Sequence, residues 1–95
     1  LHDCLFIYDY RGNLIDSVAW DNNWQFINGK SIEKIGFDDA NISSNWFPSL
    51  DSNNATPGEL NSVTNYNFTE NPKLVINEIM YSPSSDNGEY IELYN

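Results

Sequence analysis

The sequence is poor in basic residues, and this shortage argues against several classes of function. Only four Lys and Arg residues stand against 14 Asp and Glu residues in the 95-residue chain, so the formal net charge is −10 at pH 7. Binding to nucleic acid requires clusters of Lys and Arg that neutralise phosphates, and none can be built here. The same deficit argues against docking on anionic membrane surfaces. We interpret the acidity as a solvated surface, with cation binding as the alternative.

Cysteine, histidine and long apolar runs are also scarce. Cys4 is the single cysteine, which excludes an internal disulfide, and its apolar neighbours predict a buried thiol. His2 is the single histidine and has no second His or Cys nearby, so we expect a surface residue rather than a metal ligand. No apolar run approaches the roughly 18 residues that a membrane-spanning helix needs. No signal peptide is visible and the first residue is not Met, so we expect an excised piece of a larger protein.

Aromatic residues are plentiful by contrast. The chain contains 3 Trp, 6 Tyr and 5 Phe, enough to form the core of one small domain. Exposed together, Trp20, Trp24 and Trp46 could form a platform that stacks against sugars. We expect instead that at least two of the three fill the core.

The last 22 residues predict two strands joined by a loop. Leu74–Tyr81 is rich in β-branched and aromatic residues, and its length and flanking prolines favour a strand over a buried helix. Ser82–Gly88 consists of turn-forming residues. Glu89–Tyr94 alternates, with Ile91 and Leu93 on one face and polar or amphipathic residues on the other.

The first 20 residues predict a β-hairpin. Cys4–Tyr10 and Leu14–Trp20 are the two strands, and the turn between them contains Gly12, which can adopt a positive φ. Asp16 and Ser17 interrupt the second strand. They predict either a polar edge or an inward carboxylate that is hydrogen-bonded.

The middle of the chain carries weaker signals. Asn28-Gly29 predicts a turn, and Ser31–Ile35 predicts a short strand with Ile32 and Ile35 as apolar anchors. A helix beginning at Ser31 is the alternative, but Lys34 stands where a capping box requires Glu or Gln.

Asp38–Ser62 is expected to be irregular. Trp46-Phe47-Pro48 would be its hydrophobic anchor, and Thr56–Glu59 suits a type II turn because Pro57 and Gly58 occupy its two central positions. Val63–Lys73 shows no periodicity and is interpreted as a linker.

The two predicted C-terminal strands resemble the opening of the lamin tail domain, an immunoglobulin-like β-sandwich. The segments Ile76-Asn77-Glu78 and Glu89-Tyr90-Ile91-Glu92-Leu93-Tyr94-Asn95 match that opening nearly position by position. The resemblance implies structural roles for Asn77, Glu78, Glu92 and Asn95.

Residues 5 to 61 resemble the closing part of the same family. The matching segments, in order, are Ile7-Tyr8-Asp9 with Gly12, Leu14-Ile15-Asp16-Ser17-Val18-Ala19-Trp20, Gly29-Lys30-Ser31-Ile32-Glu33-Lys34, Trp46 and Thr56-Pro57-Gly58-Glu59-Leu60-Asn61. This part of the resemblance implies structural roles for Asp16, Trp20, Trp46, Pro57 and Gly58.

The order of the two matches implies an all-β, immunoglobulin-like β-sandwich of the lamin-tail type that is incomplete or circularly permuted. Residues 1–62 would be the closing part of one module, residues 63–73 a linker, and residues 74–95 the opening strands of a module. We favour a window cut from a larger tandem protein over opening strands that fold back onto the closing ones. About five strands are recognisable where an immunoglobulin-type sandwich needs about seven, so a partner strand is expected.

Few residues suggest chemistry. The sequence has no Gly-rich phosphate loop, no Cys/His cluster and no G-x-S-x-G motif. Glu78 and Glu92, on neighbouring predicted strands, could form a carboxylate pair for acid–base catalysis. We favour the interpretation that each hydrogen-bonds backbone or loop groups, so no catalytic and no cofactor-binding residue is predicted.

Acidic loop residues are the remaining candidates for a cation site. Carboxylate oxygens are suitable ligands for Ca²⁺, but the spacing of these residues matches no known calcium loop. We therefore expect no cofactor and keep Ca²⁺ as the alternative. The candidate residues are Asp38, Asp39, Asp86 and Glu89.

The resemblance implies a non-catalytic interaction or structural module of a bacterial secreted or cell-surface protein, acting as a spacer or in adhesion or assembly. Its partners would be a protein or neighbouring domains of the parent chain, without nucleic acid or membrane insertion. The alternatives are an accessory module of a secreted nuclease- or phosphatase-type hydrolase and a calcium-stabilised adhesion repeat. The nuclear lamins are a poorer match because no heptad pattern is present.

Overall fold

The computed structural model describes residues 2–36, 40–64, 74–84 and 88–94, and these residues form an all-β fold. A single short 3₁₀ turn, η1, accompanies the strands in this part of the chain. The elements are β1 (Asp3–Tyr8), β2 (Leu14–Trp20), β3 (Ile32–Lys34), η1 (Ser43–Asn45), β4 (Trp46–Pro48), β5 (Val75–Met80) and β6 (Tyr90–Tyr94).

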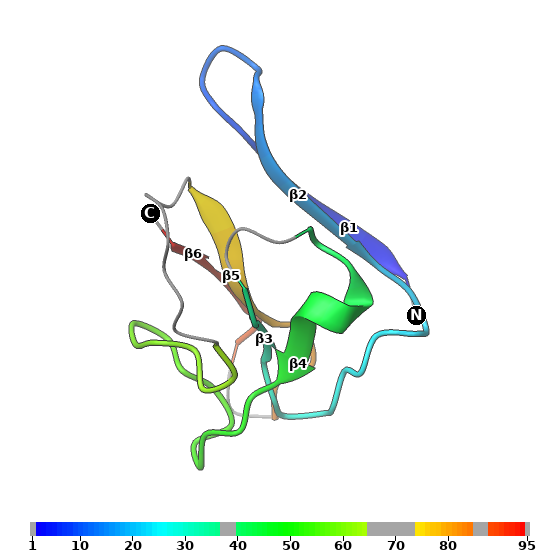
Figure 1. Cartoon of the computed structure of the whole chain (residues 1–95), viewed down its shortest axis with the longest axis vertical. Helices are drawn as coiled ribbons and strands as arrows, with labels where there is room; N and C mark the ends of the chain where they lie inside the picture. Colours follow the sequence, from blue (N-terminus) through cyan, green and yellow to red (C-terminus); the bar gives the residue numbers. More distant parts are fainter. Residues whose placement is uncertain (1, 37–39, 65–73, 85–87, 95) are drawn as a thin grey trace.

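The strands form two antiparallel sheets. One is the β1–β2 hairpin, and the other has four strands in the order β4-β3-β5-β6. The sheets pack into a sandwich, and the turn of the hairpin projects beyond the rest of the molecule (Figure 1). No helix in the described ranges is long and apolar enough to cross a membrane.

The predicted N-terminal hairpin is confirmed. Gly12 adopts a φ of 85°, as the turn between the strands requires. The first strand ends at Tyr8, whereas the sequence predicted an extension to Tyr10. The cause is Asp9, whose Oδ1 accepts hydrogen bonds from the backbone N–H groups of Arg11 and Asn13 at 2.9 Å each and so begins the turn earlier.

The prediction of a buried thiol at Cys4 is wrong, because Cys4 is exposed. Cys4 pairs with Ala19, whereas its neighbour Leu5 pairs with buried Val18. Successive side chains of a strand point to opposite faces. Leu5 therefore faces the core, and Cys4 lies on the outer face of the hairpin.

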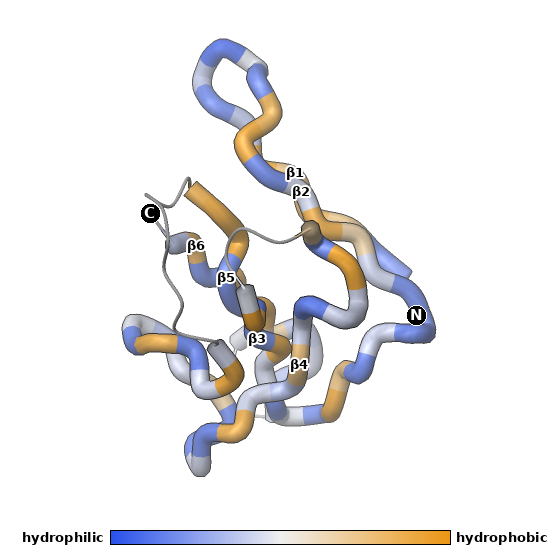
Figure 2. Tube along the Cα trace, in the orientation of Figure 1, coloured by the Kyte–Doolittle hydropathy of each residue, from blue (hydrophilic) through white to orange (hydrophobic). Residues whose placement is uncertain are grey.

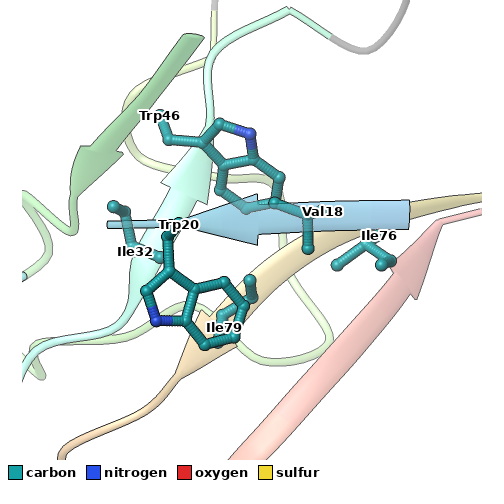
Figure 3. Close-up of a cluster of buried hydrophobic side chains, with 6 residues drawn as sticks. All are labelled: Val18, Trp20, Ile32, Trp46, Ile76 and Ile79. Carbon is teal, nitrogen blue, oxygen red and sulfur yellow. The ribbon is translucent and has the colours of Figure 1, made fainter. Parts of the chain in front are cut away.

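The core lies between the hairpin and the four-stranded sheet. Its fully buried members come from β2, β3, β4 and β5 (Figure 3), and they are Val18, Trp20, Ile32, Trp46, Ile76 and Ile79. Partly buried side chains pack around them, namely Leu5, Ile7, Trp24, Phe26 and Tyr81. The fully buried members alone are as much as 61 positions apart in the sequence, from Val18 to Ile79.

Aromatic contacts make up much of this core. The ring of Trp20 lies 5.6 Å from that of Tyr81 in an edge-on arrangement and 5.6 Å from that of Phe26. Trp24 is half-buried, with its ring 5.9 Å from that of Trp46. The prediction that at least two tryptophans fill the core is confirmed, since Trp20 and Trp46 are 4% and 3% exposed.

The middle of the chain contributes two short strands to the larger sheet. The predicted strand at Ser31–Ile35 is confirmed as β3, and the helical alternative does not occur. Gly29 has a φ of 80°, in agreement with the turn predicted there. β4 lies in the segment that was expected to be irregular. It has three residues and ends in Pro48, which suits an edge strand because proline cannot donate to a ladder.

The two C-terminal strands fold back onto the preceding part of the chain. β5 pairs with β3 through Ile32↔Ile79 and Glu33↔Glu78, and β6 pairs with the other edge of β5. β5 has apolar ends around a hydrophilic centre (Figure 2). Among the described residues, β5 and β6 thus form one sheet with β3 and β4. Most of the predicted linker lies outside these residues, since only Val63 and Thr64 of it are described.

Candidate functional site

Three glutamates lie side by side on the face of the large sheet that is opposite the core. Strand pairing aligns Glu33 of β3 with Glu78 of β5, and Glu78 with Glu92 of β6. Alternation along each strand explains this placement, because Ile32 and Ile79 on the neighbouring positions face the core. Glu33 and Glu78 are both completely buried. We call these three residues the glutamate cluster.

The loop of residues 56–62 covers the glutamate cluster, and Thr56 makes the first contacts. The backbone N–H of Thr56 donates to Glu78 Oε1 at 2.9 Å. Its hydroxyl lies 2.6 Å from the same oxygen and 2.9 Å from Glu33 Oε2. Thr56 therefore joins the two buried carboxyl groups to the start of the loop.

Two further backbone N–H groups of the loop donate to the cluster. The N–H of Gly58 donates to Glu92 Oε2 at 2.5 Å, and the N–H of Ser62 donates to Glu33 Oε1 at 2.6 Å. The hydroxyl of Ser62 donates to the same oxygen at 2.8 Å. Each of the three glutamates thus binds a different peptide group of one loop.

The local sequence explains why the loop presents these donors. Glu59 N–H donates to Thr56 O at 3.1 Å, and Gly58 has a φ of 75°. These features confirm the turn predicted at Thr56–Glu59, with Pro57 and Gly58 at its central positions. The turn directs the N–H of Gly58 toward Glu92.

A pair of buried asparagines closes the other end of the site. Asn61 Nδ2 donates to Asn77 Oδ1 at 2.7 Å, and Asn77 Nδ2 donates to Asn61 Oδ1 at 2.9 Å. Asn61 also donates to Lys34 O at 3.0 Å, and Asn77 donates to Glu92 Oε1 at 2.8 Å. The pairing of β5 with β6 is irregular between Ile76 and Glu78, which is where Asn77 stands.

The buried carboxyl groups of Glu33 and Glu78 contact each other and differ in their proton affinity. Burial raises the pKa of Glu78 above its ordinary value and outweighs the hydrogen bonds from Thr56 and Tyr90. Burial would also raise the pKa of Glu33, but hydrogen bonds from Ser49, Ser62 and Glu78 outweigh it and lower that pKa. Glu78 therefore holds its proton to a higher pH than Glu33 does.

Tyr90 of β6 belongs to the same network. Its hydroxyl donates to Glu78 Oε2 at 2.5 Å. Burial, together with the hydrogen bond to Glu78 and the charge of that residue, raises the pKa of Tyr90 well above its usual range. Tyr90 therefore stays protonated and serves as a donor.

Adjacent carboxyl groups with divergent pKa values are typical of acid–base catalysts, but here every carboxyl oxygen already has a partner. Glu33 is bonded through Oε1 to Ser62 and through Oε2 to Thr56. Glu78 and Glu92 likewise use both oxygens, toward Thr56, Tyr90, Asn77 and Gly58. The prediction that Glu78 and Glu92 hydrogen-bond backbone or loop groups is confirmed. The hydrogen bonds of the glutamate cluster hold the 56–62 loop against the sheet.

Asp16, on the core side of β2, also hydrogen-bonds to distant parts of the chain. Its Oδ2 accepts a hydrogen bond from the N–H of Ile76 at 2.7 Å, and its Oδ1 accepts one from Asn41 Nδ2 at 2.9 Å. Of the two predictions for this residue, the inward hydrogen-bonded carboxylate is correct. Asp16 thereby connects β2 of one sheet to β5 of the other.

The remaining predicted residues are dispersed. Trp20 and Trp46 belong to the core, and Pro57 is exposed at the turn of the 56–62 loop. Among the calcium candidates, Glu89 is exposed, whereas Asp38, Asp39 and Asp86 lie outside the described residues, as does the motif residue Asn95. In the ranges that the structure describes, no three His, Cys, Asp or Glu side chains are grouped to hold a metal ion.

Sequence reasoning did not single out Glu33, Ser62 or Asn61 as parts of one site. A signal for Glu33 was present, because it is the one acidic residue of the short predicted strand Ser31–Ile35. Ser62 and Asn61 lie in an Asn/Ser-rich loop where neighbouring residues look equivalent. Only the contact between the loop and the sheet distinguishes them.

No protein-family model matches the chain, and neither a curated protein nor a solved structure matches it. The resemblance to lamin tail domains therefore stays a prediction from the residues.

Proposed function

We propose that this chain is a non-catalytic β-sandwich module that makes protein–protein contacts within a larger secreted or cell-surface protein. One observation carries the proposal: all six carboxyl oxygens of the glutamate cluster are already bonded within the fold. The groups best suited to acid–base chemistry are thus occupied in holding the 56–62 loop. A spacer, adhesion or assembly role fits such a module.

We also propose that the sandwich is of the immunoglobulin-like, lamin-tail type. The support comes from contacts between the two parts of the sequence that carry the resemblance. Asp16 of the closing part accepts a hydrogen bond from Ile76 of the opening part, and Gly58 donates to Glu92 in the same way. Motif residues from both parts thus depend on one another. The bacterial extracellular setting rests on the resemblance.

The exposed apolar side chains support a role in contacts. On β1, Phe6 and Tyr8 are 55% and 56% exposed and their rings stack at 6.2 Å. On β6, Ile91 and Leu93 are each 44% exposed. Apolar side chains gathered on exposed strands are typical of surfaces that bind another protein.

The test is an assay of the isolated chain against chromogenic phosphomonoester, phosphodiester and carboxylic ester substrates, with and without Ca²⁺, Mg²⁺ or Mn²⁺. We expect rates no higher than those of buffer. Turnover that is lost in Glu78→Gln or Glu92→Gln, but kept in the exposed control Glu59→Gln, would contradict the proposal.

A further inference from the structure

Among the described strands, β1 and β6 are each at an outer edge of their sheet. β6 is the last strand of the four-stranded sheet, and no other described strand pairs with its outer edge. β1 is likewise an outer strand of the two-stranded sheet. An unpaired strand edge presents a row of N–H and C=O groups and is a template for the addition of another strand.

The inner face of β6 is incompletely covered. Ile91 pairs with buried Ile79 and lies on the same face of the sheet, yet it remains 44% exposed. Leu93, two residues further along β6, lies on the same face and is equally exposed. The apolar face of the large sheet therefore continues past the edge of the described core.

A cleft of about 320 Å³ lies beside Ile91, where the hairpin approaches β5 and β6. Its apolar lining includes Leu5, Trp20, Ile79 and Ile91. The indole Nε1–H of Trp20 is buried and has no acceptor in the part of the chain that the structure describes.

The charged residues around the cleft determine which kind of ligand it would bind. Asp3 and Glu89 are among its lining residues, and no basic residue is. Two of the chain's lysines are engaged elsewhere, since Lys30 Nζ donates to Ser49 O at 3.1 Å and Lys34 lies over the Trp46 ring. With a net charge of −10, a second copy of this chain would be repelled, whereas a basic segment would be attracted.

We propose that the outer edge of β6 and the adjoining cleft bind an extended, basic segment of a partner protein. The segment adds to β6 as a further strand, and its apolar side chains cover Ile91 and Leu93 and enter the cleft. Its Lys or Arg side chains meet Asp3 and Glu89. Main-chain pairing of this kind supplies affinity, while side-chain pockets supply specificity. This inference rests on the proposed role as an interaction module and names its partner chemistry.

The probe is a capped seven-residue peptide, Lys-Val-Thr-Val-Thr-Val-Lys, titrated into ¹⁵N-labelled protein. We expect saturable shifts of the amide resonances of residues 90–94 and of the Trp20 Nε1–H resonance. Two control peptides separate the contribution of main-chain hydrogen bonds from that of the positive charges. One is N-methylated at the three valines, which removes main-chain donors, and the other has Glu in place of both lysines. We expect neither control to bind measurably.

Protein variants test the two kinds of contact. Ile91→Ser removes apolar surface beside the cleft and should weaken binding about fivefold. Its control is Ile27→Ser, which changes a side chain of similar exposure that does not line the cleft. The double variant Asp3→Asn/Glu89→Gln should weaken binding about 3- to 10-fold at low salt and leave the melting temperature unchanged.

Several results would overturn the proposal. They are the absence of binding at millimolar peptide, equal binding of either control peptide, and shifts confined to other parts of the surface. A peptide-free dimer whose interface includes β6, detected by light scattering and NMR, would replace the basic partner with a second copy. None of these results bears on turnover, so failure of this inference is distinguishable from failure of the proposed function.

Discussion

At the scale of single residues, the glutamate cluster is unusual because two of its acidic side chains are completely buried. Carboxyl groups are rarely buried completely, because the charged form loses its hydration. Hydrogen bonds, chiefly from Ser49 and Ser62, outweigh the effect of burial on Glu33 and lower its pKa. Glu78, its neighbour, instead has a raised pKa. The pKa shifts of the two buried carboxyl groups thus have opposite directions.

This arrangement predicts how Glu78→Gln changes the dependence of stability on pH. Folding raises the pKa of Glu78 above the ordinary value of 4.5, so its stabilising contribution is complete below that pH and is lost as pH rises through the raised pKa. Glutamine resembles the protonated form and does not titrate. We expect the unfolding free energy of Glu78→Gln, measured with urea, to increase relative to that of the wild type as pH rises from acidic to mildly alkaline.

The control for this experiment is Glu59→Gln, which removes the same charge from an exposed position and reports the effect of net charge alone. Glu33 acts in a different pH range, because its lowered pKa confines its loss of stabilisation to pH values below 4.5. A difference between Glu78→Gln and the wild type that does not vary with pH would contradict the raised pKa of Glu78.

At the scale of elements, the 56–62 loop is ordered by contacts with the sheet rather than by regular secondary structure. Three of its backbone N–H groups donate to glutamates of three different strands. Its turn depends on Gly58, whose φ of 75° lies in the region that residues with a Cβ adopt at a cost. The loop in turn covers a polar sheet face that would otherwise have to be hydrated.

Gly58→Ala should therefore lower the unfolding free energy by about 1–2 kcal/mol. An added Cβ at Gly58 would meet no heavy atom within 4 Å, so the loss reflects backbone strain alone. Gly88→Ala is the matched control, because Gly88 also has open space and lacks a positive φ, and it should change stability by less than about 0.5 kcal/mol. Equal losses in urea unfolding would show that the turn does not depend on the left-handed conformation.

At the scale of the whole molecule, the hairpin and the large sheet share one core. Val18 and Trp20 of β2 pack with Ile76 and Ile79 of β5, and Asp16 connects the same two strands by a hydrogen bond. The described parts of the chain therefore have no second core that could unfold separately. The hairpin turn beyond this core contributes little to stability.

We expect one cooperative thermal transition. Far-UV circular dichroism reports the strands, near-UV circular dichroism reports the aromatic cluster around Trp20 and Tyr81, and the two melting curves should coincide. Val18→Ala in the hairpin and Ile79→Ala in β5 should shift both curves together to lower temperature. Light scattering on the same sample checks that the species is a monomer. Separate transitions would show that the hairpin opens independently of the sheet.

The amino-acid sequence by itself determined the local elements of this protein. Period-two alternation identified the last strand, and β-branched and aromatic composition identified the strand at Leu74–Tyr81. Gly12, Gly29 and Gly58 marked turns that the structure contains. These features follow from interactions between near neighbours, which a linear pattern records. β4 escaped prediction because three residues ending in proline leave too short a pattern.

Only the tertiary structure decided which elements meet. Glu33, Ser62 and Asn61 become parts of one site because a loop folds across the sheet, and no local pattern specifies that contact. Cys4 is exposed because the core lies on the other side of its strand. From the sequence we favoured a window cut from a tandem protein over C-terminal strands that fold back, yet β5 and β6 do return onto β3. The pattern within each strand is the same in both arrangements, so it could not distinguish them. The choice depends on burial of Ile76 and Ile79 against Val18 and Trp20, and burial is a property of the whole fold.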